Sequence, residues 1–356
     1  MAFDVNNTYT YLMAVQAMPP LTTFLRDRYF PSSEEDIFGT EKVLVEYRDG
    51  NKRLAPVIAP RYGGVTIQRQ GSEMHEYEPP TIGPKRTTTI DDITRRGFGE
   101  AILPTITPAE RESQLALRDA KELDDMITRR EEAMAAELLQ KNGYVLKRVA
   151  DDLEVFDEFE IYFYDGTNNP ANYTPSTPWN AAGADIFSDL HIMIKNLQQR
   201  GLPATDLIVN DGVADIIMNN EAIYKKLLIP DGKYNLGTVD PKELPAGASL
   251  IAVLNVQGRN ISIISYTETY TDDSGNDVPF IADGTAILTA PNCGKTLYGA
   301  VTQIEQADMK RHTYGARRVP KPFVDADKNV SEVTLSSKPL LVPINKSPWQ
   351  VANVVA

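Results

Sequence analysis

The stretch from residue 108 to residue 142 constrains the fold of this chain more than any other part of the sequence. Thr107, Pro108 and Glu110 form the start signal of a helix: a capping threonine, a proline at the first helical position and a glutamate that completes a capping box. Neither glycine nor proline follows until Gly143, a residue type that suits the position after a helix end. At 1.5 Å per residue the predicted helix is about 50 Å long, whereas most globular helices are about a third of that.

One side of this predicted helix is apolar, with side chains that recur at roughly helical spacing. The helix also carries six Lys or Arg and nine Asp or Glu, which gives it a net charge of −3. We therefore expect it to pack along a core with one side and to present an acidic surface with the other. The apolar positions are Leu115, Leu123, Ile127, Met134 and Leu138.

Composition places the chain among ordinary globular proteins and excludes several classes. Its 356 residues suggest one large domain or two to three sub-domains. Hydrophobic residues make up 42% and charged residues 24%, which is enough for a core and typical of soluble proteins. The net charge of −13 argues against ordinary nucleic-acid binding, which depends on Lys and Arg at phosphates. The single cysteine, Cys293, excludes an intramolecular disulfide.

Neither a signal peptide nor a membrane span is expected. The first residues, MAFDVNNTYTYLMAVQ, lack a basic start followed by a long apolar run. No stretch approaches the roughly 18 apolar residues that a membrane span requires. The sequence predicts a soluble protein that stays in the cytoplasm where it is made, without a membrane partner.

Before the long helix, the sequence predicts an arm over residues 1–38 and a β-ribbon over residues 41–90. The arm is broken by prolines and has one short amphipathic piece, TTFLRDRYF. In the ribbon, Val43, Val45 and Tyr47 alternate with other residues, as expected of a half-buried strand. A long ribbon is not stable alone, so it must lie on other parts of a protein.

The middle of the ribbon, LAPVIAPRYGG at residues 54–64, is unusually apolar for a loop that faces water. Two prolines stiffen it and two glycines let it turn. We interpret it as a segment that contacts another copy of the same protein. Residues 41–90 have a net charge of +2, which favours an acidic partner such as the long helix of that copy. The predicted inter-subunit contacts are Leu54, Val57, Ile58, Arg61 and Tyr62.

After the long helix, YVLKRV and VFDEFEIYFYDG predict a pair of strands, and residues 166–182 predict a polar loop. Residues 183–300 then alternate between helices and strands and predict a compact α/β sub-domain. Residues 301–356 are strand-rich, with SKPLLVPIN as the clearest strand.

Two short motifs of the sequence match cofactor-binding patterns only in part. CGKT at 293–296 lacks the earlier glycine of a phosphate-binding loop, and TLYGAV after it predicts a strand instead of a helix. GFGEAI at 97–102 lacks the third glycine of a dinucleotide fingerprint.

Individual residues give no catalytic or metal site either. Cys293 has no identifiable base, and adjacent carboxylate pairs look like solvated surface because neighbours in sequence do not share a helix face. We therefore predict no catalytic, cofactor or metal site. The three histidines, His75, His191 and His312, lack the spacing with Cys, Asp or Glu that a metal site needs. The carboxylate pairs are Asp124–Asp125, Glu131–Glu132 and Asp272–Asp273.

Four segments, in this order, resemble the lambda-type phage major capsid protein family (major capsid protein E). They are FGTEKVLVEYRDGNKRLAPVIAPRYGG, EYEPPTIGPKRTTT, DLIVNDGVADIIMNNEAIYKKL, and ARRVPKPFVDAD with SSKPLLVPIN. The resemblance covers roughly residues 20–345. It implies an α+β chain with the tailed-phage major capsid fold, in which residues 1–38 form an N-terminal arm and residues 41–90 an extended loop over a neighbour. Residues 91–180 and 301–356 would build a peripheral domain around the spine helix, and residues 183–300 an axial domain.

The resemblance also implies the function and the partners. The chain would assemble into hexamers and pentamers of an icosahedral shell around double-stranded DNA, in the cytoplasm of the host. A separate scaffolding protein, a portal and a decoration protein would be further partners. Two other functions stay open: an encapsulin-type compartment shell with the same fold, and a soluble α/β enzyme. The ribbon has an alternative too, as a β-arm that wraps on its own core.

Overall fold

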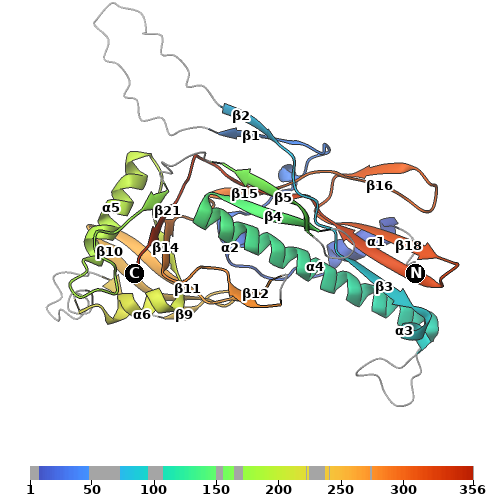
Figure 1. The fold of residues 1–356 in the computed structure, drawn as a ribbon, viewed down its shortest axis with the longest axis horizontal. Helices are drawn as coiled ribbons and strands as arrows, with labels where there is room; N and C mark the ends of the chain where they lie inside the picture. Colours follow the sequence, from blue (N-terminus) through green and yellow to red (C-terminus); the bar gives the residue numbers. More distant parts are fainter. Residues whose placement is uncertain are drawn as a thin grey trace, which may run out of the picture.

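The computed structural model describes residues 8–47, 73–94, 107–149, 155–163, 171–221, 223, 237–239, 241–272 and 275–355. The body is elongated, with an α/β lobe at one end and smaller sheets toward the other (Figure 1). Helix α4, Pro108–Lys141, runs along the body from near the lobe to the opposite end. No helix in the described part of the chain combines the length and apolarity needed to cross a membrane.

The predicted start of the long helix is confirmed in detail. The Thr107 hydroxyl accepts a hydrogen bond from the backbone N–H of Glu110, whose carboxylate accepts one from the Thr107 N–H at 2.9 Å. The end differs from the prediction, because Asn142 rather than glycine takes the left-handed conformation, with φ of 59°. Gly143 is needed for another reason: a Cβ there would overlap the backbone of Ile161 on the neighbouring strand.

The apolar side of α4 is confirmed, and it contributes to two cores. Leu123 and Ile127 are buried with Tyr11 in a small core near the first half of the helix. Met134 and Leu138 belong to the main core, which lies where the lobe meets the body. Leu115 is only partly buried. One long helix therefore ties two packed regions together.

The lobe is built on an eight-stranded sheet whose order is β6-β21-β14-β7-β11-β10-β8, with β9 beside β10. Two strands come from outside the expected 183–300 segment: β6 precedes it and β21 lies close to the C-terminus, so the chain returns into the lobe. The helices and strands predicted in the described part of this segment are confirmed. The second helix was predicted over GVADIIMNNEAIYKKLL, and α6 covers its first part; residues 222 and 224–228 lie outside the described residues. The elements are β6 Asn172–Tyr173, α5 Ile186–Gln199, β7 Asp206–Val209, α6 Asp211–Asn219, β8 Gly237–Thr238, β9 Lys242–Glu243, β10 Ala248–Val256, β11 Arg259–Tyr266, β14 Thr285–Thr289 and β21 Gln350–Asn353.

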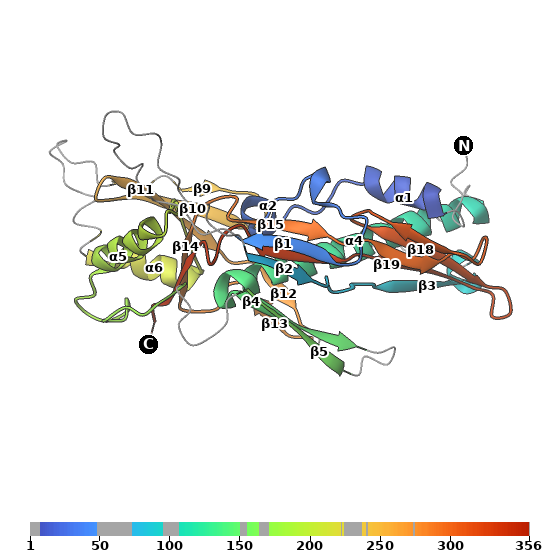
Figure 2. The same cartoon turned by 90° about the horizontal axis from the view of Figure 1, so that it is seen from above.

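The arm lies against the body instead of standing free. It contains α1 Thr8–Ala17, α2 Leu25–Tyr29 and the 3₁₀ turn η1 Glu34–Asp36. In the view from above, α1 lies beside β18, and α2 lies at the middle of the molecule (Figure 2). Four apolar side chains in and beside α2 are buried in the main core: Phe24, Leu25, Tyr29 and Phe30.

The two described ends of the ribbon, β1 Val43–Tyr47 and β2 Glu73–Tyr77, pair as antiparallel strands. The predicted alternation is confirmed for Val43 and Val45, which are buried in the main core, while Leu44 between them is 59% exposed. The base of the ribbon is therefore fixed to its own subunit.

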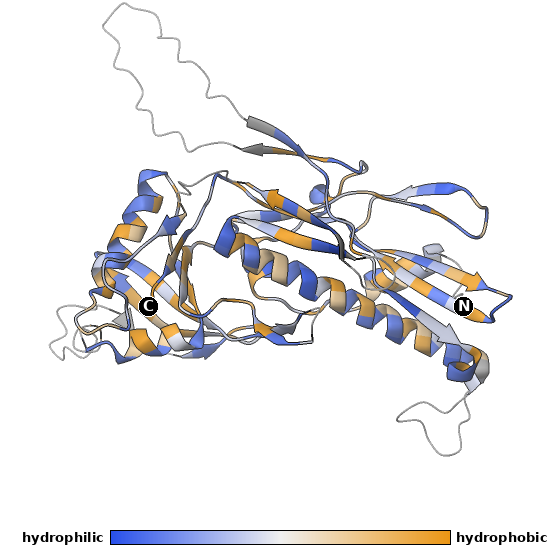
Figure 3. Ribbon diagram, in the orientation of Figure 1, coloured by the Kyte–Doolittle hydropathy of each residue, from blue (hydrophilic) through white to orange (hydrophobic). Residues whose placement is uncertain are grey.

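The remaining strands form pairs and one three-stranded sheet. β4 and β5 are the predicted pair after α4, β15 pairs with β20, and β3 joins β19 and β18. Apolar and polar residues alternate along α4 (Figure 3). The elements are β3 Lys85–Thr89, α3 Ile90–Thr94, β4 Gly143–Val149, β5 Val155–Tyr162, β12 Thr269–Thr271, β13 Asp277–Pro279, β15 Gly294–Tyr298, β16 Val301–Ile304, β17 Arg311–Tyr314, β18 Val319–Asp325, β19 Val330–Ser336 and β20 Pro339–Pro343.

Candidate assembly site: the arm, the long helix and the ribbon base

Helix α2 of the arm carries two arginines that reach opposite parts of the molecule. Arg26 donates to Glu131 of α4 at 2.7 Å. Arg28 donates to Asp206 at the start of β7 in the lobe at 2.8 Å, and the Tyr29 hydroxyl donates to the same carboxylate at 3.0 Å. A five-residue helix is thus bonded both to the long helix and to the central sheet of the lobe.

Glu131 is the centre of a buried ion network. Its side chain is fully buried, and it lies between Arg26 of the arm and Arg318, the residue before β18. Arg318 donates two hydrogen bonds to the Glu131 carboxylate, at 2.8 and 3.1 Å, and a further one to Asp124 at 2.6 Å. Such a two-point arginine–carboxylate pair fixes geometry as well as charge. The network therefore holds the arm, the long helix and the C-terminal strands in one arrangement.

The neighbouring Glu132 binds the N-terminus of α2. Its carboxylate accepts hydrogen bonds from three successive backbone N–H groups at the start of α2 at 2.7 to 3.1 Å, and from the hydroxyl of Tyr266 on β11 at 2.9 Å. The first N–H groups of a helix have no partner within the helix, so a buried helix start needs such an acceptor. The donors are Phe24, Leu25 and Arg26.

Burial acts on both glutamates, but their pKa values shift in opposite directions. Burial alone would raise the pKa of Glu131, but the Arg318 and Arg26 guanidinium groups outweigh it and hold that pKa below its ordinary value. Burial raises the pKa of Glu132, and its hydrogen bonds oppose this only in part. The prediction that the Glu131–Glu132 pair is solvated surface is therefore wrong. The two side chains do point to different sides of the helix, but other parts of the protein cover both: Arg26 and Arg318 cover Glu131, and the start of α2 covers Glu132.

The CGKT segment holds the arm. Gly294 lies against the ring of Phe30, which leaves no room for a side chain, and the Thr296 hydroxyl donates to the Phe30 carbonyl at 2.7 Å. Lys295 forms an ion pair with Asp36 at 3.3 Å. The segment forms strand β15, so the strand prediction is confirmed. Each residue that resembles a phosphate loop has a packing partner in the arm.

Cys293 is buried beside the arm, and burial raises its pKa to about 12. Its sulfur lies 3.7 Å from the carbonyl oxygen of Tyr29. A thiol with a raised pKa is a poor nucleophile, because the thiolate is the reactive form. This position favours a packing role.

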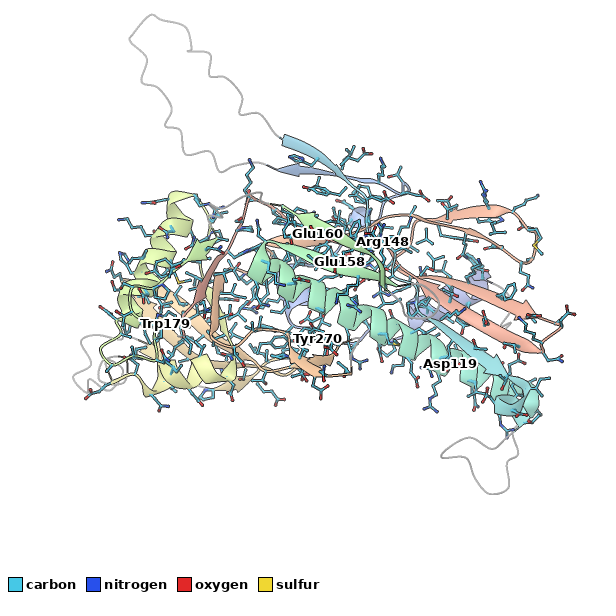
Figure 4. All side chains as sticks on the ribbon, in the orientation of Figure 1. Asp119, Arg148, Glu158, Glu160, Trp179 and Tyr270 are labelled. Atoms are coloured by element: carbon cyan, nitrogen blue, oxygen red, sulfur yellow. The ribbon has the colours of Figure 1, made fainter. Side chains whose placement is uncertain are left out.

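The exposed side of α4 is basic, contrary to the expectation of an acidic helix surface. Arg118, Lys121, Arg129 and Arg130 are exposed. The acidic residues that give the helix its net negative charge are mostly turned toward the body: Asp119 on α4 (Figure 4) has a side chain only 15% exposed. The net charge of the helix, counted along the sequence, did not predict which residues face the solvent.

Three side chains at the β16–β17 hairpin could offer atoms to a metal ion. Glu305, Asp308 and His312 bring one ligand atom each to within 4.8 Å of one another. His312 is hydrogen-bonded to Asp308 at 2.8 Å, and Glu305 accepts a hydrogen bond from Tyr314. The sequence search missed this group because the hairpin turn, rather than a regular spacing, brings the residues together.

The five predicted inter-subunit contacts lie outside the described residues, as does GFGEAI at 97–102. They are Leu54, Val57, Ile58, Arg61 and Tyr62. The residues that the sequence reasoning missed are the charged positions of the arm. The signal was present in LRDRY at 25–29, where two arginines lie between two apolar residues, Leu25 and Tyr29, that are both buried.

An α+β subunit with an arm, a ribbon, a spine-like helix and a separate α/β lobe has the tailed-phage major capsid fold. The structure is similar over 100% of both chains to a prophage capsid protein from E. coli CFT073, with a TM-score of 0.66 and 16% identity. It is also similar to a phage-related protein from Bordetella bronchiseptica RB50, with a TM-score of 0.50 and 9% identity over 96% of this chain and 95% of that one. No curated protein sequence matches the chain.

The family model of phage major capsid protein E matches residues 7–349, and the chain belongs to that family. It is a structural subunit of a phage capsid, a homo-oligomeric shell. The SrpI encapsulin of Synechococcus elongatus PCC 7942 gives a TM-score of 0.43 at 11% identity, over 95% of this chain and 92% of that one. The family match decides between the two kinds of shell in favour of the phage capsid.

Proposed function

We propose that this capsid subunit assembles into hexamers and pentamers of an icosahedral shell that encloses double-stranded DNA. Assembly would take place in the cytoplasm of the host. A separate scaffolding protein, a portal and a decoration protein would complete the particle, and the subunit itself would perform no catalysis. The family match and the fold support this role.

We further propose that the ribbon of each subunit overlaps a neighbouring copy and that Leu54, Val57, Ile58, Arg61 and Tyr62 make the contact. One observation supports it most directly. Val43 and Val45 fix the base of the ribbon in the main core, and Leu44 points outward. Burial of apolar side chains on the neighbour would drive the contact at roughly 25 cal/mol per Å².

The basic side of α4 changes the charge argument for this contact. Residues 41–90 have a net charge of +2, and the exposed arginines and lysine of α4 would repel them. We therefore assign the ribbon to an apolar contact on the neighbour and no longer to the long helix. Charge would set the register of the contact more than its affinity.

The test is a variant in which Val57, Ile58 and Tyr62 are each replaced by serine. We expect a soluble, folded subunit that forms no closed shells, with circular dichroism and electron microscopy applied to the same sample. The matched control replaces three exposed apolar side chains in and beside strands β16 to β18, Ile304, Met309 and Phe323, by serine.

The possible results of this test distinguish three arrangements of the ribbon. An unfolded ribbon variant would mean that the ribbon packs on its own core. Normal shells would mean that this part of the ribbon makes no assembly contact. Loss of shells in the control alone would move the contact to strands β16 to β18.

A further inference from the structure

The basic side of α4 is a row of cations on an otherwise acidic protein. Arg118, Lys121 and Arg129 lie within one arc of the helix, because successive residues are rotated by about 100°. Arg130 is exposed on its flank. From Arg118 to Arg130 the row is about 18 Å long at 1.5 Å per residue.

Several carboxylates of the same helix are paired with arginines of other elements. Asp124 and Glu131 pair with Arg318, and their side chains are 13% and 0% exposed. Glu122, at 38% exposure, pairs with Arg86 of β3 at 2.9 Å and with Arg118 at 3.1 Å. Four bases of α4 are thus exposed, whereas its carboxylates from Asp119 to Glu132 are buried or partly buried. Asp125, one turn from both Lys121 and Arg129, is the partly buried acid within this arc.

The net charge of −13 does not cancel this local field. At physiological salt the screening length is about 8 Å, so a bound polyanion senses the charges next to it and little of the remaining molecule. Arginine suits phosphate because its planar donor group matches two phosphate oxygens. The side chains of the row are long and flexible, which suits a backbone contact that reads no base sequence.

We propose that the basic side of α4 binds the phosphate backbone of duplex DNA without regard to sequence. The inference rests on the proposed function, because it makes this side of the long helix the surface that meets the enclosed genome. Through this surface an acidic shell protein would hold DNA.

The test measures binding of a fluorescent random-sequence duplex of about 30 base pairs to the purified full chain at 50 to 200 mM salt. Contacts to four phosphates predict a slope of log K against log salt of about −3 to −4, which is roughly a hundredfold loss of affinity over this range. Replacing Lys121 and Arg129 by glutamine should make the slope smaller by about 2. The control replaces Lys310 and Arg311, exposed on the β16–β17 hairpin, by glutamine and changes net charge equally.

The inference is supported if the α4 variant loses slope and affinity while the hairpin variant keeps both. It is overturned if the wild-type chain binds no duplex at 50 mM salt, or if both variants behave alike. It is also overturned if the α4 variant fails to form shells in the absence of DNA, because that side would then contact another copy. Electron microscopy of the wild-type chain separates the two proposals: failure to form shells would refute the proposed function, whatever the DNA titration shows.

Discussion

Replacing Arg318 by methionine should be among the most destabilising single changes in this protein. Methionine keeps much of the length and apolar volume of the arginine but removes its charge. The carboxylate of Glu131 would keep only Arg26 as an ionic partner, and Asp124 would lose its bond at 2.6 Å. Hydrogen bonds to Thr128 and Ser337, at 3.2 and 3.1 Å, would be lost as well.

The expected loss is about 3–5 kcal/mol of unfolding free energy, the usual result of leaving a buried charge without its partner. A matched control exists on the same helix. Arg118 pairs with Glu122 across one helical turn at 3.1 Å, but its side chain is 67% exposed. Replacing Arg118 by methionine should cost only about 0.3–0.5 kcal/mol, because water screens an exposed pair.

The assay is denaturant unfolding of the unassembled subunit, followed by tryptophan fluorescence. The chain has two tryptophans, and they report on different regions: Trp349 is buried in the main core and Trp179 in the core of the lobe. Trp179 also donates to Asp189 of α5 at 2.9 Å (Figure 4). A change that loosens the arm should first alter the signal from Trp349.

A second variant tests the cause. Adding Glu131→Gln to Arg318→Met removes the buried charge that lost one of its two arginine partners, so the double variant should be more stable than the sum of the two single variants predicts. The reasoning is refuted if Arg318→Met costs no more than Arg118→Met, or if the two single effects simply add.

Three further outcomes are expected from the same unfolding assay. Gly294→Ala should cost about 1–3 kcal/mol of unfolding free energy, because the added methyl group overlaps the ring of Phe30. Gly39→Ala should cost little, because the space around Gly39 is open. Equal effects of the two changes would contradict this packing. Ile127→Asp should give insoluble protein because it buries a charge, whereas Met126→Asp, at a position 51% exposed, should be soluble. Because burial raises the pKa of Glu132 above 4.5, the folded state holds its proton more tightly than the unfolded state, so unfolding free energy should fall as pH rises above about 4.5. Glu132→Gln should lack this slope, and parallel pH curves for the two proteins would contradict the assignment.

The long helix and the strands of the lobe could be predicted because their signals are local. A capping box, a proline at the first position and a run without glycine mark α4. Short apolar runs bounded by turn residues mark strands such as β7, all four residues of which are buried. Such patterns depend only on neighbours in the sequence.

The charged interior could not be predicted in this way, because each partner is distant in sequence. Glu131 and Glu132 have the composition of helix surface, and only Arg318, 187 residues away, and the start of α2 turn them into buried groups. The basic side of α4 was missed for the same reason. Which carboxylates face inward depends on where the arginines of other elements lie, and a count along the helix cannot show this.

The arm that is clamped between the long helix and the lobe also has a consequence for synthesis. Its partners lie 105 to 285 residues further along the chain, from Glu131 to Arg317. Phe30 leaves the ribosome early, but Thr296, 266 residues later, must be made before it can bind. At 5–20 residues per second that delay is about 13–50 s. Throughout it, Phe30 lacks its place against β15, so the arm exposes apolar side chains for longer than a segment whose partners are close in sequence, and it completes its contacts late in synthesis.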